Sequence, residues 1–190
     1  MKPFGKLPTF THIRLIDAGF TLIELITSLA LLLIVSAITL PQMNFVNSVI
    51  MSHETKKLAS TFSFLQQRAM TTNTKSEITF DLSNDSYTYQ TTNNKTYTNK
   101  LPRHIQFGFV PNTMGPPASP KKPIKHAVTF PKRTPSPCVT FSPDGNISAG
   151  TIYLTDSKKR YMKALSCSVE EASFLRMYSY RNGKWIADRE

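Results

Sequence analysis

The residue with the clearest chemical consequence is Glu24. It is the only charged residue in a run of 21 mostly aliphatic residues from Phe20 to Leu40. A helix of this length would be about 30 Å long, close to the thickness of the hydrocarbon core of a membrane. A single acid costs on the order of 2–3 kcal/mol at the centre of a membrane helix and less near an end. Because nothing else in the run can neutralise the carboxylate, we expect the partner of Glu24 to lie on another chain.

The remaining polar residues form no pattern that is typical of an enzyme. The seven glycines never occur as Gly-x-Gly, and the chain has no phosphate-binding loop, His-Glu-x-x-His motif or Gly-x-Ser-x-Gly motif. A site built from histidine and cysteine would need closer spacing than the chain offers. We therefore predict no enzymatic activity, no cofactor and no metal. The four scattered histidines are His12, His53, His104 and His126.

Basic residues are the second informative feature. The formal net charge is +11, and no acidic residue occurs between Ser86 and Pro143. Lysine and arginine side chains on one exposed face bind phosphates, often beside aromatic side chains that stack on bases. A solvated basic surface that aids solubility is the more ordinary explanation. The candidates for nucleic-acid binding are Lys121, Lys122, Lys125, Lys132, Arg133, Lys158, Lys159, Arg160 and Lys184.

The chain has two cysteines, Cys138 and Cys167. Pairing them would close a loop of about 30 residues and contribute about 3 kcal/mol in the chain-entropy model. Such a disulfide is typical of proteins in an oxidising compartment. We predict this disulfide, and the alternative is a pair of buried thiols.

The elements that must position these residues begin with a basic leader at 1–19, followed by an expected transmembrane helix at 20–41. Beyond Pro41, residues 42–73 are expected to form an amphipathic helix that packs on a domain. Its apolar stripe is predicted to consist of Val46, Ile50, Leu58, Phe62, Leu65 and Ala69. The leader is expected inside the cell and the following domain outside.

From Ser76 onwards the hydrophobic period changes to two, so residues 74–190 are expected to form a β-rich head. Asn182-Gly183 is the strongest hairpin signal in the chain. Eight of the thirteen prolines fall at 111–137, which predicts an exposed, extended loop, with Val128-Thr129-Phe130 docking as a short edge strand. The expected fold class is α+β, a long N-terminal helix packed on antiparallel sheets. Strands are predicted over 77–80, 87–89, 95–100, 105–110, 138–141, 151–154, 161–165 and 174–180.

The N-terminal stretch Gly19-Phe20-Thr21-Leu22-Ile23-Glu24, with its apolar run and Pro41, resembles the class III signal of type IV pilins and pseudopilins. The resemblance implies that a prepilin peptidase cleaves between Gly19 and Phe20 and that Phe20 is then N-methylated. It also implies that Glu24 pairs with the N-terminal amine of a neighbouring subunit in a helical filament. Pro41 corresponds to the proline at which helices of this family bend.

Two further stretches are similar to the GspH/FimT group of pseudopilins: Leu65–Asn73, and Val139–Gly145 with Gly150–Leu154 after it. The group's fold is a long N-terminal helix with two packed antiparallel sheets. Its C-terminal hairpin usually carries Gly-Arg, where this chain has Gly183-Lys184-Trp185.

The resemblance implies a minor pseudopilin or minor pilin that helps to initiate or cap a type II secretion pseudopilus or a type IV pilus. Its expected location is the bacterial inner membrane, crossed once, with the head in the periplasm or outside. The expected partners are other pilin or pseudopilin subunits, the prepilin peptidase and the cytoplasmic membrane. The alternative is a minor pilin of a DNA-uptake pilus that binds DNA through the basic head.

Two simpler interpretations compete for the N-terminal segment. An ordinary secretory signal would be cleaved after Ala37, but its apolar core is typically about 7–15 residues long and contains no acid. A plain membrane anchor would leave Glu24 without a purpose and predicts no processing at Gly19.

Overall fold

The computed structural model describes residues 20–91, 95–115, 121–133, 136–168 and 174–188. The chain divides into two units, Met1–Gln42 and Met43–Glu190. Helix α1 (Leu22–Thr72) contributes to both units, and every strand follows in the second. In the part of the chain that the structure describes, no helix is both long and apolar enough to cross a membrane.

The predicted leader at 1–19 lies outside the described residues. The helix assignment of α1 continues through Pro41. The transmembrane role of residues 20–41 and the bend at Pro41 remain predictions.

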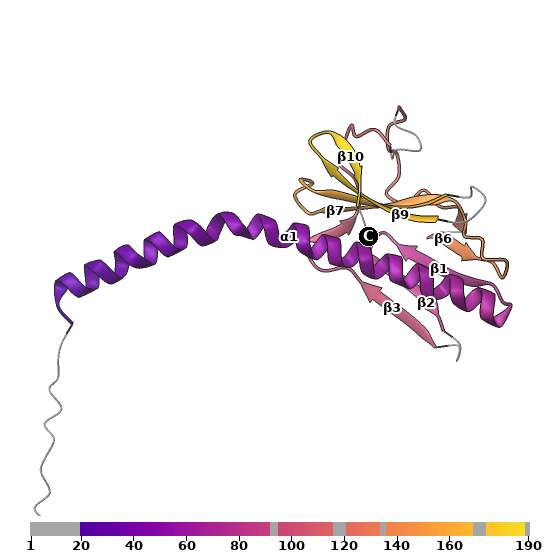
Figure 1. The fold of residues 1–190 in the computed structure, drawn as a ribbon, viewed down its shortest axis with the longest axis horizontal. Helices are drawn as coiled ribbons and strands as arrows, with labels where there is room; N and C mark the ends of the chain where they lie inside the picture. The colour runs from indigo at the N-terminus through magenta and orange to yellow at the C-terminus, as the bar shows by residue number, and fades with distance from the viewer. Residues whose placement is uncertain (1–19, 92–94, 116–120, 134–135, 169–173, 189–190) are drawn as a thin grey trace, which may run out of the picture. The chain divides into compact units, whose positions relative to one another are not determined.

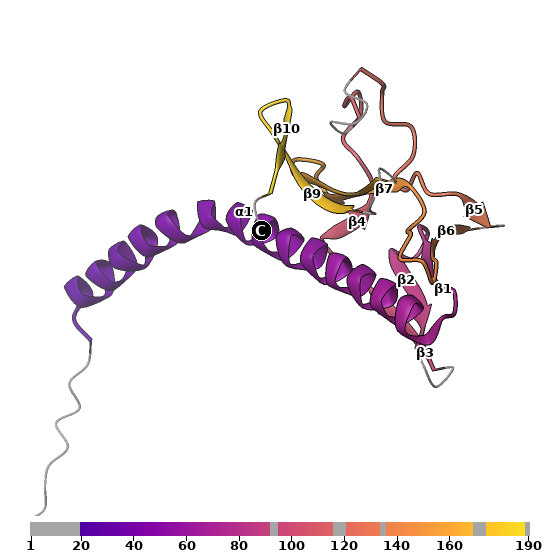
Figure 2. The ribbon, with the colours of Figure 1, turned by 45° about the vertical axis from the view of Figure 1, so that its right-hand side comes forward.

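Two five-stranded antiparallel sheets form the head (Figures 1 and 2). The first sheet has the order β3-β2-β1-β6-β5, and the second has the order β10-β9-β8-β7-β4. This architecture confirms the predicted α+β class. The strands are β1 (Ser76–Asp81), β2 (Ser86–Gln90), β3 (Thr96–Lys100), β4 (Ile105–Phe107), β5 (Lys132–Arg133), β6 (Ser136–Phe141), β7 (Gly150–Asp156), β8 (Met162–Ser168), β9 (Phe174–Arg181) and β10 (Lys184–Ala187).

The C-terminal half of α1 packs on the sheets through one buried face, and that face differs in part from the predicted stripe. Val46 is 51% exposed and Ile50 is only partly buried, so neither belongs to the fully buried face. Met51 and Thr55 take their places, and the Thr55 hydroxyl donates to the Met51 carbonyl at 2.8 Å. The buried face consists of Met51, Thr55, Leu58, Phe62, Leu65 and Ala69.

Phe62 lies where α1 packs against both sheets. Its ring contacts those of Phe141 and Phe80 in the first sheet, with centroids 5.3 and 6.5 Å away. It also meets Phe130, at 6.3 Å, which lies over Gly150 of β7 in the second sheet. A Cβ atom at Gly150 would come within 2.6 Å of the Phe130 ring, so this contact requires glycine.

Backbone conformations at two turns agree with the sequence signals. Asn73 has φ +50° immediately after α1, and the Thr74 N–H donates to the Ala69 carbonyl at 3.2 Å, as in a Schellman-type helix end. Asn182 and Gly183 have φ of +50° and +77° between β9 and β10. Two successive positive values are typical of a type I′ turn. The predicted hairpin is therefore confirmed.

The proline-rich segment returns to the sheet beside the point where it leaves. The Gly108 N–H donates to the Tyr153 carbonyl at 3.0 Å, and the Tyr153 N–H donates to the Ala127 carbonyl at 2.8 Å. Val128 then forms a bridge with Ile152, which confirms the predicted docking of 128–130 at a strand edge.

The prediction of an exposed, extended loop over 111–137 was wrong at the C-terminal end of that segment. Lys132–Arg133 form β5, which pairs with the start of β6, and Pro137 belongs to β6. Pro137 has no backbone N–H and so cannot donate a hydrogen bond to β5. The N–H of the next residue, Cys138, donates to the Pro131 carbonyl at 3.0 Å.

Candidate functional site

Glu24 has polar partners within its own segment. The Thr21 N–H and the Thr21 hydroxyl donate to one Glu24 carboxylate oxygen, at 3.0 and 2.9 Å. The Glu24 N–H in turn donates to the Thr21 hydroxyl oxygen at 3.3 Å. This reciprocal arrangement is a capping box at the start of α1. These hydrogen bonds come from uncharged groups and leave the carboxylate charge without a counterion, so a charged partner on another chain remains a prediction.

The first unit presents apolar side chains around the whole circumference of its helix. Phe20 is 85% exposed, and the large apolar residues of the segment are each more than half exposed. A helix that is apolar on every side is stable only when lipid or protein covers it. Gly19, the predicted cleavage residue, lies outside the described residues. The exposed apolar side chains are Leu22, Ile23, Leu25, Ile26, Leu29, Leu31, Leu32, Leu33, Ile34 and Val35.

The structure distributes the candidate nucleic-acid-binding residues among three parts of the head. Lys121, Lys122 and Lys125 lie in the proline-rich segment, and Lys132–Arg133 form β5 at the edge of the first sheet. The others lie at the turn between β7 and β8 and at the start of β10 in the second sheet. The candidate residues are therefore contributed by several separate elements of the head.

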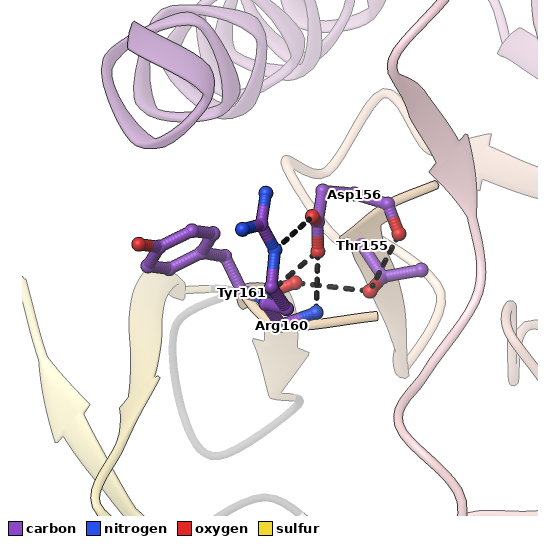
Figure 3. Close-up of polar contacts among 4 residues, drawn as sticks. All are labelled: Thr155, Asp156, Arg160 and Tyr161. Carbon is purple, nitrogen blue, oxygen red and sulfur yellow. Dashed lines mark hydrogen bonds and ion pairs between the residues drawn. The ribbon is translucent and has the colours of Figure 1, made fainter. Parts of the chain in front are cut away.

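The turn between β7 and β8 is organised by Asp156, which is buried (Figure 3). Its carboxylate accepts hydrogen bonds from the backbone N–H groups of Arg160 and Tyr161, at 2.6 and 2.9 Å. The Arg160 Nε atom lies 3.5 Å from the other carboxylate oxygen. Lys159 adopts φ +54° in this turn, and its N–H donates to the Asp156 carbonyl at 2.8 Å. Asp156 thereby fixes a turn that presents Lys158 and Lys159 to solvent.

The β9–β10 hairpin lies beside this turn. Met162, at the start of β8, pairs with Tyr180 near the end of β9. A groove of about 680 Å³ is lined by residues of the turn, the hairpin and α1. Arg181 and Lys184 on the hairpin are exposed. The groove-lining residues are Ser48, Met51, Arg160, Tyr161, Met162, Lys163, Ser179, Tyr180, Arg181, Asn182 and Gly183.

Lys163 is close in sequence to the basic turn, but its side chain is buried. Its side chain is 10% exposed, and Nζ lies 2.6 Å from the Asp188 carboxylate. The Ser179 hydroxyl donates to the other Asp188 oxygen, also at 2.6 Å. This pair ties the end of the described chain to the middle of the second sheet.

The ion pair predicts acid sensitivity of the head. Partial burial alone would raise the pKa of Asp188, but the hydrogen bonds from Lys163 and Ser179 and the charges of Lys163 and Arg181 outweigh it, and the pKa is lowered. A lowered pKa in the folded state gives stability that is present above the ordinary aspartate pKa of about 3.9 and is lost as the pH falls through the folded value. Asp188→Asn should cost about 2 kcal/mol at neutral pH, since Lys163 stays buried without its partner.

Denaturant unfolding at neutral pH and below pH 4 measures this contribution. The difference between the wild type and Asp188→Asn should shrink as the pH falls. Asp144→Asn is the matched control. Asp144 is an exposed turn residue whose carboxylate accepts hydrogen bonds from the backbone N–H and the side-chain amide of Asn146. A constant difference between the wild type and Asp188→Asn at all pH values would contradict the assignment.

The predicted disulfide is not present. Within the described residues both cysteines are thiols, and both are buried. Cys138 lies on β6 in the first sheet and Cys167 on β8 in the second, so the two strands belong to different layers. Burial raises the pKa of the Cys167 thiol to about 11, which makes it unreactive at neutral pH. The alternative of two buried thiols describes the structure.

No metal centre is built by the part of the chain that the structure describes: no three His, Cys, Asp or Glu side chains gather there. His53 lies beside Glu54 on α1, with Nδ1 3.7 Å from the carboxylate. The absence of enzymatic activity remains a prediction.

Residues 54–169, more than half of the chain, match the family model described as type II transport protein GspH. The chain belongs to the GspH family. Residues 16–40 match the prokaryotic N-terminal methylation motif. Among solved structures, the minor pseudopilin EpsH from the type 2 secretion system of Vibrio cholerae is similar, with 10% identity and a TM-score of 0.45 over 67% of this chain and 95% of that chain. No curated protein matches the chain.

The GspH-family match confirms the resemblance inferred from the helix end and from the Val139–Gly145 stretch. Three residues of this GspH-family chain were missed by sequence reasoning: Thr21, Asp156 and Asp188. The Thr-x-x-Glu spacing is a capping-box signature that identifies Thr21. Asp156 ends a strand just before Ser-Lys-Lys-Arg, a typical position for an acid that closes a turn. Nothing in the sequence marks Asp188.

Proposed function

We propose that this GspH-family chain is a minor pseudopilin of a type II secretion pseudopilus, stored in the inner membrane through residues 20–41 before it joins the filament. The observation that carries the proposal is the contrast between its two units. The head contains a core of buried apolar residues, whereas the segment from Phe20 to Val35 exposes its large apolar residues on all sides. Such a segment needs lipid at one stage and neighbouring helices at another.

The proposed route begins with cleavage between Gly19 and Phe20 by a prepilin peptidase, followed by N-methylation of Phe20. The match of residues 16–40 to the N-terminal methylation motif supports this step. In the filament, Glu24 would then face the N-terminal amine of a neighbouring subunit. In a low-dielectric bundle, leaving either charge without its partner is expensive. A role in starting or capping the filament follows from the resemblance to minor subunits.

The N-terminal mass of the protein purified from its native membrane tests the proposal. We expect the chain to begin at a methylated Phe20. The matched control is the same protein from cells without prepilin peptidase activity, where Met1 should be retained. A chain that begins just after Ala37 would identify a secreted domain, and an intact Met1 in the presence of the peptidase would identify a plain anchor. Either result would overturn the proposed route.

A further inference from the structure

We propose that the basic end of the head binds anionic phospholipid headgroups while the subunit is stored in the membrane. This surface, the basic turn–hairpin surface, consists of Lys158, Lys159, Arg160, Arg181 and Lys184. The inference rests on the proposed function, since it requires an anchored chain.

Two elements that are distant in the sequence bring these charges together. The turn between β7 and β8 and the β9–β10 hairpin line one groove, to which Arg160 and Arg181 both contribute. Lys158, Lys159 and Lys184 are exposed beside them. The surface is held in shape by the hydrogen bonds of buried Asp156 to the turn, as Figure 3 shows for Arg160 and Tyr161.

The nearby carboxylates are already engaged. Asp156 is bound by the turn itself and by Arg160, and Asp188 is bound by Lys163 and Ser179. Among the described residues of β7 to β10 and their turns, Asp156 and Asp188 are the only acids. The surface therefore carries an excess of positive charge, which attracts anions within about one Debye length, roughly 8 Å at physiological ionic strength.

The residues of α1 that line the groove follow the apolar run closely in the sequence. Ser48 and Met51 of α1 line it together with Arg160 and Arg181. The apolar run ends at Leu40. Even a fully extended chain between Leu40 and Ser48 spans no more than about 30 Å. When residues 20–41 are in a membrane, the basic turn–hairpin surface is tethered within reach of the headgroups, where a cluster of lysines and arginines binds anionic lipid.

The contacts of Trp185 favour lipid over nucleic acid as the ligand. Single-stranded nucleic acids bind basic surfaces that also offer free aromatic rings for stacking. Here Trp185 packs in tilted contacts against Tyr180 and Tyr153, with ring centroids 5.1 and 5.9 Å away. Its indole N–H donates to the Met114 carbonyl at 3.0 Å. These contacts engage the Trp185 ring within the head and hold the hairpin and the proline-rich segment together.

Trp185 provides the probe, because it is the only tryptophan and follows Lys184 directly. The full chain is reconstituted in phosphatidylcholine vesicles with or without phosphatidylglycerol, together with a lipid that carries a quencher in its headgroup. We expect stronger quenching of Trp185 when phosphatidylglycerol is present, and loss of that increment at high salt. The double variant Lys158→Gln/Lys159→Gln should lose most of the increment. Lys121→Gln/Lys122→Gln, with the same change of charge in the proline-rich segment, should keep it.

An alkaline wash of the vesicles separates the two proposals. A chain that stays in the vesicles but shows no phosphatidylglycerol-dependent quenching would overturn this inference and leave the proposed anchor intact. A chain that is washed away would overturn the anchor, and the inference with it. Equal loss of quenching in both double variants would show a general charge effect and reject the assigned surface. Binding of short DNA that depends on Lys158 and Lys159, without any lipid response, would assign the surface to nucleic acid instead.

Discussion

Phe62→Ala is expected to lower the free energy of unfolding of the head by about 3–5 kcal/mol, the usual cost of removing a large buried ring from a core. Phe62 has no exposed surface, and its ring meets Phe80, Phe130 and Phe141. Through Phe130, which lies over Gly150, the same ring supports the second sheet. The cavity left by alanine therefore opens where the helix contacts both sheets.

Denaturant unfolding of the full chain in mild detergent measures this loss, with circular dichroism reporting on the strands and Trp185 fluorescence on the second sheet. Phe64→Ala is the matched control, because Phe64 lies on the same helix and is 46% exposed. Phe64→Ala should lower the free energy of unfolding by about 1 kcal/mol or less. An equal decrease in the free energy of unfolding for the two variants would contradict the assignment of Phe62 to the centre of the core. Separate transitions for the two probes would show that the sheets unfold independently.

The comparison of these two phenylalanines also shows how far periodicity predicts a buried face. Leu58, Phe62, Leu65 and Ala69 follow helical spacing and were predicted correctly. Towards the N-terminal side, the predicted stripe continued through Ile50 to Val46. The true face continues through Thr55, a polar residue whose hydroxyl bonds to the preceding turn of the helix and can be buried at little cost. A scan for apolar residues cannot see such a position.

The two cysteines of the predicted disulfide lie on different sheets, and spacing along the chain does not show which sheet a strand joins. Strand alternation identified the segments that became β6 and β8, which carry Cys138 and Cys167. Each strand then paired within its own sheet, Ile78 with Val139 in one and Ile152 with Leu165 in the other. Strand pairing depends on contacts between residues far apart in the sequence, which local signals do not contain.

The basic residues show the same limit in the candidate site. Their number and the stretch without acids could be read from the sequence, but not which of them would meet. Arg160 and Arg181 come together because Met162 pairs with Tyr180. Lys163 is three residues from Arg160 and is nevertheless withdrawn into the ion pair with Asp188. The number of basic residues in a stretch of sequence therefore overestimates the charge that the folded surface presents, because some of these residues point into the protein.

The second large effect is expected for substitution of Glu24. Two roles of its carboxylate can be tested separately: accepting hydrogen bonds in the capping box, and carrying a negative charge. Glu24→Gln keeps an oxygen that can accept from Thr21 in the capping box, but it removes the charge. If the charge pairs with the amine of a neighbouring subunit, its loss leaves that amine buried alone, at a cost of about 3–5 kcal/mol. Incorporation of Glu24→Gln into filaments should then fall on the order of a hundredfold or more, with unchanged membrane insertion and processing.

Thr21→Ala is the complementary variant, because it removes the hydroxyl partner in the cap and keeps the charge of Glu24. The loss of a capping hydroxyl costs about 1 kcal/mol, which the rest of a long helix can absorb. The measurement is the ratio of subunit in the assembled filament fraction to subunit in the membrane. A strong defect for Glu24→Gln with a weak one for Thr21→Ala would support the charge pair between subunits. The reverse order would show that the carboxylate acts within its own helix, as the cap that orders the first turn after Phe20.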